Sequence, residues 1–89
     1  MHEQNIEIIN RLGLHARAAA KFSTTASQFG SRITVTCHGK VVNGKSIMGL
    51  MMLAAARGTE IRVTVEGTDE MAALQALREL IENRFGEPE

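Results

Sequence analysis

One histidine stands in a sequence context that could carry chemistry. His15 directly precedes Ala16 and Arg17, where a glycine-containing loop passes into an alanine-rich segment of high helix propensity. If a helix begins at Ala16, the unpaired backbone N–H groups of its first turn, those of Ala16 and Arg17, lie beside the imidazole and form an anion site, most naturally for phosphate. Arg17 adds a positive charge whose fork geometry suits phosphate oxygens.

Reversible capture of a phosphoryl group is the chemistry that fits His15 best. The positive end of a helix disfavours the imidazolium form, so the ring should stay neutral and nucleophilic near neutral pH. The sequence places no carboxylate next to His15, which argues against a hydrolytic Ser-His-Asp triad. The alternative is that His15 is an ordinary surface histidine.

A second segment matches a phosphate-binding pattern in form only. Residues 39–46 fit the P-loop pattern G-x-x-x-x-G-K-[ST], but residues 40–42 within it have strand character. We therefore interpret Ser46 as the N-cap of a helix that begins at Ile47. A phosphate added to Ser46 would lie at that helix N-terminus beside Lys45 and would change the local charge by about −2.

The helix after Ser46, predicted over residues 47–57, is apolar around most of its surface. The face expected to lie in the core carries Leu50, Leu53 and Ala54. The other side carries Ile47, Met48 and Met51. Methionine is adaptable and suits docking with several partners, so these three residues are candidates for a docking surface. The alternative is that all of them are buried under the sheet.

Length and composition exclude several classes of protein. The 89 residues, 44% of them hydrophobic and 22% charged, predict one globular domain over residues 1–89. Ten basic residues balance ten acidic ones and three phenylalanines are the only aromatics, so a nucleic-acid binder is not expected. The single Cys37 neither forms an internal disulfide nor anchors a thiolate metal site. We expect a cytoplasmic protein with no leader, no direct membrane insertion, and neither a metal nor an organic cofactor.

The charges are divided along the chain. Residues 1–59 contain seven basic and two acidic residues, whereas residues 60–89 contain three basic and eight acidic residues. Arg11, Arg17 and Lys21 are expected to gather around His15, with the acidic residues of the last helix elsewhere. Such a basic face would attract phosphate and an acidic partner.

Periodicity predicts the order βαββαβα. Strands are expected at residues 5–8, 32–37, 40–42 and 60–66, with a tight turn at His38 and Gly39 between the second and the third. Helices are expected from Ala16 to a stop at Gly30, over residues 47–57, and after a cap at Thr68 or Asp69. The buried stripe of the last helix is expected to carry Met71, Leu74, Leu77 and Ile81. Clean alternation in the strands indicates an α+β fold with an antiparallel sheet, one face covered by helices and the other in water.

Two motifs at a characteristic spacing carry a resemblance. Residues 12–17 (LGLHAR) and 43–50 (NGKSIMGL) resemble HPr, the histidine-containing phosphocarrier family of the bacterial phosphotransferase system. The resemblance implies an open-faced β-sandwich, with three helices on a four-stranded antiparallel sheet. It implies that enzyme I, charged by phosphoenolpyruvate, phosphorylates Nδ1 of His15, with Arg17 stabilising the phosphate, and that His15 passes the group to A-type domains of sugar permeases or regulatory phosphorelays.

The resemblance also assigns the second motif. It implies that Ser46 is the site of a regulatory HPr kinase in some bacteria, and that Ile47, Met48 and Met51 dock partners. Such a protein is a monomeric carrier in a relay and not a stand-alone enzyme. Ala18 stands where the family often has proline, which should change the rigidity of the helix start only slightly. The sugar branch and the nitrogen branch both remain open, as does a regulatory binding module without onward transfer.

Overall fold

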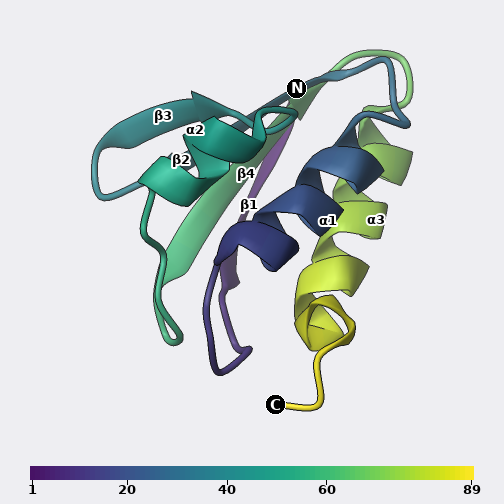
Figure 1. Ribbon diagram of the computed structural model, residues 1–89. Coiled ribbons are helices and arrows are strands. Elements are labelled where there is room, and N and C mark those ends of the chain that lie inside the picture. The colour runs from purple at the N-terminus through teal and green to yellow at the C-terminus, as the bar shows by residue number, and fades with distance from the viewer.

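The computed structural model describes residues 1–89 and shows one layer of helices on one face of a four-stranded sheet (Figure 1). The elements follow the order β1 (His2–Glu7), α1 (Ala16–Ala26), β2 (Arg32–Cys37), β3 (Lys40–Asn43), α2 (Ile47–Met52), β4 (Glu60–Glu66), α3 (Glu70–Glu82) and the short 3₁₀ helix η1 (Arg84–Gly86). The strand order is β1-β4-β2-β3, with every neighbouring pair antiparallel. The predicted α+β fold, an open-faced β-sandwich, is confirmed.

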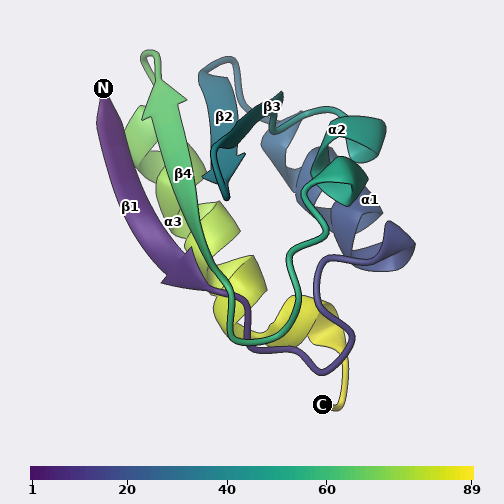
Figure 2. The ribbon, with the colours of Figure 1, turned by 90° about the vertical axis from the view of Figure 1, so that its left-hand side faces the viewer.

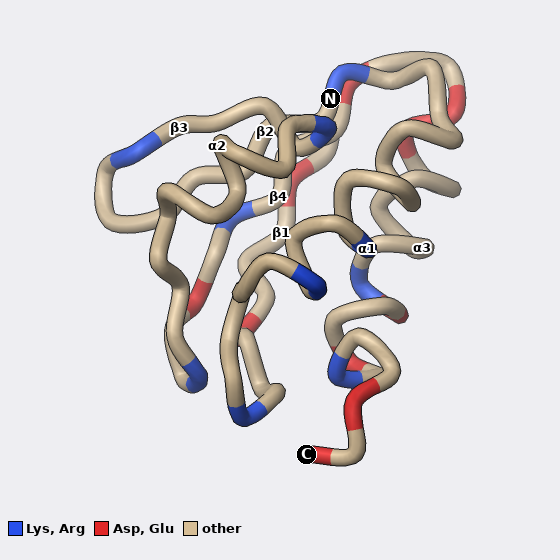
Figure 3. Tube along the Cα trace, viewed as in Figure 1, with Lys and Arg blue, Asp and Glu red and all other residues tan.

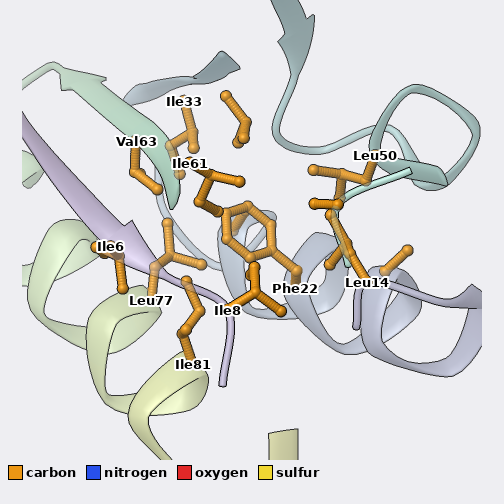
Figure 4. Close-up of a cluster of buried hydrophobic side chains, with 14 of the residues drawn as sticks. Ile6, Ile8, Leu14, Phe22, Ile33, Leu50, Ile61, Val63, Leu77 and Ile81 are labelled. Atoms are coloured by element: carbon orange, nitrogen blue, oxygen red, sulfur yellow. The ribbon is translucent and has the colours of Figure 1, made fainter. Parts of the chain in front are cut away.

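The inward face of the sheet and the apolar faces of the helices form one core (Figure 4). In β4 the residues Ile61, Val63 and Val65 are buried, while the alternate positions Glu60, Arg62 and Glu66 are exposed. This period of two is what a sheet with one wet face requires. Across the layer the core contains Phe22 of α1, and Leu77 and Ile81 of α3, all fully buried.

A two-residue turn joins β2 and β3. His38 and Gly39 have φ angles of 51° and 78°, and Cys37 pairs with Lys40 on either side of them. Positive φ at both central residues is the geometry that matches the right-handed twist of the strands. The segment predicted as a tight turn is therefore confirmed, and residues 40–42 of the formal P-loop match lie in strand β3.

The helix predicted over residues 47–57 is too long. It ends at Met52, with Leu53 as its C-cap, and Ala54 takes a positive φ of 50°. This reversal points Ala55 into the core, 2% exposed, so the buried residues are Leu50, Leu53 and Ala55, and the expectation for Ala54 is wrong. Alanine propensity favoured a continued helix, but burial of Ala55 and its neighbours determines where the helix ends.

Other predicted boundaries differ by a few residues. Helix α1 ends at Ala26 and continues as turns toward Gly30, and β1 begins at His2. On α3 the buried stripe contains Ala73, Leu74, Leu77 and Ile81. Met71 is 57% exposed, so the expectation that it belongs to the buried stripe is wrong. At 100° per residue the other members of the stripe lie to one side of Leu74 and Met71 lies to the other, so Met71 falls on the flank of the stripe.

The start of α3 is tied to two other segments. Asp69 is its N-cap residue, but the carboxylate accepts hydrogen bonds from the Gly30 and Ser31 N–H groups, at 2.9 and 3.0 Å, and from the Ser31 hydroxyl. Glu70 accepts hydrogen bonds from the Gly67 N–H at 3.2 Å and from His2 Nδ1 at 2.5 Å. The helix end is therefore fixed to the loop before β2 and to strand β1.

Glu70 should make the fold sensitive to acid. Hydrogen bonds from His2 and Gly67, with the Met1 amino group, lower the pKa of Glu70 from an ordinary 4.5 to about 2. A depressed pKa in the folded state stabilises the fold above the unfolded pKa, and this contribution is lost as the pH falls from about 4.5 toward about 2. We expect Glu70→Gln to flatten the fall in unfolding free energy over this window in urea titrations. Glu82→Gln, on the exposed side of the same helix, should leave the slope as in the parent.

Candidate functional site

His15 lies at the start of α1, as predicted. It is the N-cap residue, in extended conformation, and its carbonyl accepts the first helical hydrogen bond, from the Ala19 N–H at 2.8 Å. The N–H groups of Ala16, Arg17 and Ala18 make no bond within the protein, and the His15 side chain does not cap them. The His15 ring is 28% exposed. Free amides and a positive helix end therefore lie beside an accessible imidazole.

The loop before His15 is held by the segment that follows α2. The Leu14 N–H donates to the Ala55 carbonyl at 2.9 Å, and the Leu14 side chain is buried. Gly13 has a φ of +69°, and a Cβ built on it would lie 2.6 Å from the Ala55 oxygen. A residue with a side chain would push the two segments apart. The close approach explains why glycine stands two residues before the histidine.

A cleft of about 630 Å³ opens at His15. Its lining consists of Arg11, Leu12, His15, Ala16, Arg17, Glu87, Pro88 and Glu89. Arg11 Nη1 pairs with Glu89 at 3.1 Å, whereas Arg17 takes part in none of the salt bridges of the chain. Arg17 is thus the unpaired guanidinium of the cleft, and phosphate oxygens are its preferred ligands.

Glu87 is the site residue that the sequence analysis missed. Its Oε2 lies 2.5 Å from His15 Nε2, although 72 residues separate the two along the chain. The expectation that no carboxylate accompanies the histidine is therefore wrong in three dimensions. The expectation considered only the residues next to His15 in the sequence. In the fold, η1 turns the C-terminal segment back against the loop after β1 (Figure 2). No local pattern around His15 signals this contact.

The pKa of Glu87 reflects opposing effects. Burial of the carboxylate raises it, but hydrogen bonds from Asn10 and His15 and the nearby charges of His15 and Lys21 lower it, and the net pKa lies below its ordinary value. Glu87 is therefore ionised at neutral pH. An ionised carboxylate only accepts hydrogen bonds.

The predicted segregation of charge is only partly correct. The expectation placed the acids of the last helix elsewhere but left out the C-terminal segment, where Glu87 contacts His15 and Glu89 pairs with Arg11. Figure 3 shows red segments beside blue ones at this end of the chain. Lys21 Nζ donates to the Phe85 carbonyl at 2.6 Å, which anchors η1 to α1. Of the three basic residues expected at the site, Arg17 alone lacks an acceptor in the chain.

The second motif folds as a cap and a short helix. The Ser46 hydroxyl accepts a hydrogen bond from the Gly49 N–H at 3.0 Å, which confirms Ser46 as the N-cap. Lys45 Nζ donates to the Phe29 carbonyl at 2.7 Å, so its charge is directed to the segment that follows α1. Neither feature forms a P-loop cradle.

The apolar residues of α2 are exposed on the side away from the core. Ile47, Met48 and Met51 are 42%, 71% and 41% exposed, and the alternative of complete burial is wrong. Met52, which the sequence analysis did not single out, is 64% exposed beside them. These four residues form the α2 patch. Helix α2 packs against α1, the helix that begins at His15 (Figure 1).

Other titratable groups show no sign of a second site. Burial raises the pKa of the Cys37 thiol, although the charge of Lys40 opposes this effect. A buried thiol of raised pKa is unreactive. No group of three or more His, Cys, Asp and Glu side chains is placed to hold a metal ion. None of the helices has the length and apolar character needed to cross a membrane.

Comparison with known proteins agrees with this geometry. The family described as "PTS HPr component phosphorylation site" matches residues 2–83. Phosphocarrier protein HPr of Neisseria meningitidis (serogroup A) is 61% identical over 89 residues, covering all of both chains. The HPr of Xylella fastidiosa (strain Temecula1) is 55% identical over 87 residues, or 98% of each. The chain belongs to the HPr family, the phosphocarriers of the phosphotransferase system.

Solved structures show the same fold. HPr-C-His from Thermoanaerobacter tengcongensis superposes with a TM-score of 0.96 at 50% identity, covering all of both chains. An HPr dimer from the same organism gives a TM-score of 0.79 at 52% identity, covering 98% of this chain and all of that one. The family match ends at residue 83, before Glu87, so the C-terminal contact with His15 lies outside the part that the family description covers.

The contact at Gly13 can be tested against a matched glycine. Gly13 and Gly39 both have positive φ, but a Cβ on Gly39 would meet nothing within 4 Å. We expect Gly39→Ala to lower the unfolding free energy by about 1–2 kcal/mol through backbone strain alone. Gly13→Ala should lower it by at least about 1 kcal/mol more, because the Ala55 carbonyl must also move. Urea denaturation measures both, and equal losses would show that the approach to Ala55 is not a constraint.

Proposed function

We propose that the chain is a phosphocarrier that takes a phosphoryl group on His15 and passes it on. The observation that carries the proposal is the accessible His15 ring beside the free N–H groups of α1 and the unpaired Arg17. Backbone amides and a guanidinium neutralise an incoming phosphate, and the imidazole supplies the nucleophile. The backbone N–H groups of Ala16 and Arg17 would hold the phosphate oxygens, and the Arg17 side chain would stabilise their charge.

Membership of the HPr family supports the identity of the partners. The phosphoryl group would come from phosphoenolpyruvate through enzyme I, would reside on Nδ1 of His15, and would pass to A-type domains of sugar permeases or of nitrogen-branch relays. We propose that this happens in the cytoplasm, with the chain acting as a monomeric single domain.

Phosphorylation of His15 is the first prediction of this proposal. Incubation of the protein with phosphoenolpyruvate and enzyme I should add one acid-labile phosphate, detected by the mass of the intact chain. His15→Ala should abolish the gain, whereas His38→Ala, in the turn between β2 and β3, should not. A mass gain that survives acid treatment, or one that persists in His15→Ala, would contradict the proposal.

The α2 patch supports a docking surface. Exposed methionines are adaptable, and a cluster of exposed apolar residues marks partner contacts. We infer that Ile47, Met48 and Met51 contact enzyme I and the acceptor domains. Ser46 lies at the start of this helix, so a phosphate placed there by an HPr kinase would add negative charge next to the patch. Regulation by that route is part of the proposal.

Docking can be measured with a matched pair of methionines. Met48 on α2 and Met71 on α3 are both exposed, at 71% and 57%. Met48→Ala should weaken the binding of enzyme I by about 1 kcal/mol, roughly fivefold, because a contact of the interface is lost. Met71→Ala should leave binding unchanged in the same calorimetric titration. An equal effect of the two substitutions would place the interface elsewhere.

A regulatory binding module is the second candidate. The exposed α2 patch and the cap at Ser46 would suffice for a protein that docks partners according to its phosphorylation state. Onward transfer separates the candidates. Phosphorylated protein, freed of enzyme I and mixed with A-type domains, loses its phosphate to them if it is a carrier. It keeps the phosphate if it is a regulatory module only.

A further inference from the structure

Glu87 is held from two sides in the cleft. Its Oε2 faces His15 Nε2 at 2.5 Å, and its Oε1 accepts a hydrogen bond from Asn10 Nδ2 at 3.0 Å. The Glu87 side chain is only 13% exposed, although it belongs to the C-terminal segment. Asn10 is fully buried in the loop after β1. A carboxylate with both oxygens engaged has a fixed orientation toward the histidine ring.

The orientation of Asn10 follows from its neighbours. Asn10 Nδ2 also donates to the Gly13 carbonyl at 2.8 Å. Since a carbonyl only accepts, the NH₂ group of Asn10 must face Gly13, and its second N–H points to Glu87. The reversed amide would set its oxygen against two acceptors. In the observed orientation Asn10 Oδ1 is buried and has no partner. The loop therefore keeps the two hydrogen bonds that the Asn10 NH₂ group donates and leaves the oxygen unpaired.

The tautomer of His15 follows from the donor and acceptor roles of the same hydrogen bonds. Glu87 is ionised, because its hydrogen bonds and the nearby positive charges lower its pKa despite burial. Both of its oxygens therefore accept, and His15 Nε2 must be the donor. A neutral imidazole carries a single N–H, so a proton on Nε2 leaves Nδ1 with a free lone pair.

We propose that Glu87 is a positioning residue that holds His15 as the Nε2–H tautomer and so makes Nδ1 the nitrogen that takes the phosphoryl group. The inference rests on the proposed function, which already places the phosphoryl group on Nδ1, and adds the residue that selects this nitrogen. In the transfer, the Nδ1 lone pair forms the N–P bond. The bond from phosphorus to the donor atom breaks, and its electron pair stays with the donor. Nε2 keeps its proton throughout.

The same carboxylate has a second effect on the phosphorylated ring. A ring with phosphorus on Nδ1 and a proton on Nε2 carries a positive charge, which the Glu87 carboxylate offsets across the Nε2–H bond. A carboxylate that orients a histidine and stabilises its cationic form is the arrangement of catalytic triads, here directed at phosphoryl transfer. When the acceptor attacks, the electron pair of the N–P bond returns to Nδ1 and restores the neutral tautomer.

Glu87→Gln should reverse the tautomer and not merely weaken the contact. The second N–H of Asn10 needs an acceptor, so the oxygen of the new amide turns to Asn10 and its NH₂ group turns to His15. Nε2 must then accept, and the single proton of the ring moves to Nδ1, where it blocks the lone pair. An amide in place of a triad carboxylate impairs catalysis for this reason.

Nitrogen-15 NMR of the His15 ring in the full chain tests this inference. At a pH where the ring is neutral, the parent should show Nε2 protonated, and Glu87→Gln should shift the population toward protonated Nδ1. Glu89→Gln removes a neighbouring carboxylate of the same segment and should leave the tautomer as in the parent. Phosphorylation of Glu87→Gln by enzyme I should slow by about tenfold or more.

A merely structural role of Glu87 would not change the tautomer. Protonated Nδ1 in the parent, or the same tautomer in parent and Glu87→Gln, overturns the inference. The NMR measurement needs neither a donor nor an acceptor protein. A parent chain that takes no phosphate on His15 therefore refutes the proposed function separately, and the two failures are distinguishable.

Discussion

The apolar layer between the sheet and the helices holds the chain in place on both sides of His15. Leu14 is buried immediately before His15, and Ala18 and Ala19 are buried shortly after it, so the chain is held in the core on both sides of the histidine. Only a short stretch between these anchors faces water. A reactive ring on a rigid support loses little conformational freedom when a phosphate binds, which is what precise transfer between proteins requires.

Parts of the site were predictable because they are local. A helix start at Ala16 follows from propensity, and its free N–H groups and Arg17 lie within a few residues of His15. The cap at Ser46 and the turn at His38 and Gly39 are also local chemistry, and each was predicted from its residue types. Alternation in the strands was enough to indicate which face of the sheet is buried.

The remainder depends on tertiary packing. The end of α2 is set by burial of Ala55, against the helix propensity of the alanines that follow Met52. The contact of Glu87 with His15 depends on η1, where Arg84 and Phe85 adopt positive φ and the Phe85 side chain is fully buried. No rule of sequence spacing relates two residues that lie 72 positions apart. The positive φ angles of two non-glycine residues also cannot be predicted from the residue types at those positions.

The fold of the C-terminal segment against the loop after β1 has a practical consequence for handling the protein. Residues 87–89 line the cleft, and the Glu89 carbonyl accepts the Arg11 N–H at 2.9 Å. A purification tag or fluorophore fused there would begin at the mouth of the cleft. The N-terminus lies at the other end of the molecule (Figure 2). Labels and surface attachment for work on partner binding are therefore better placed on that end.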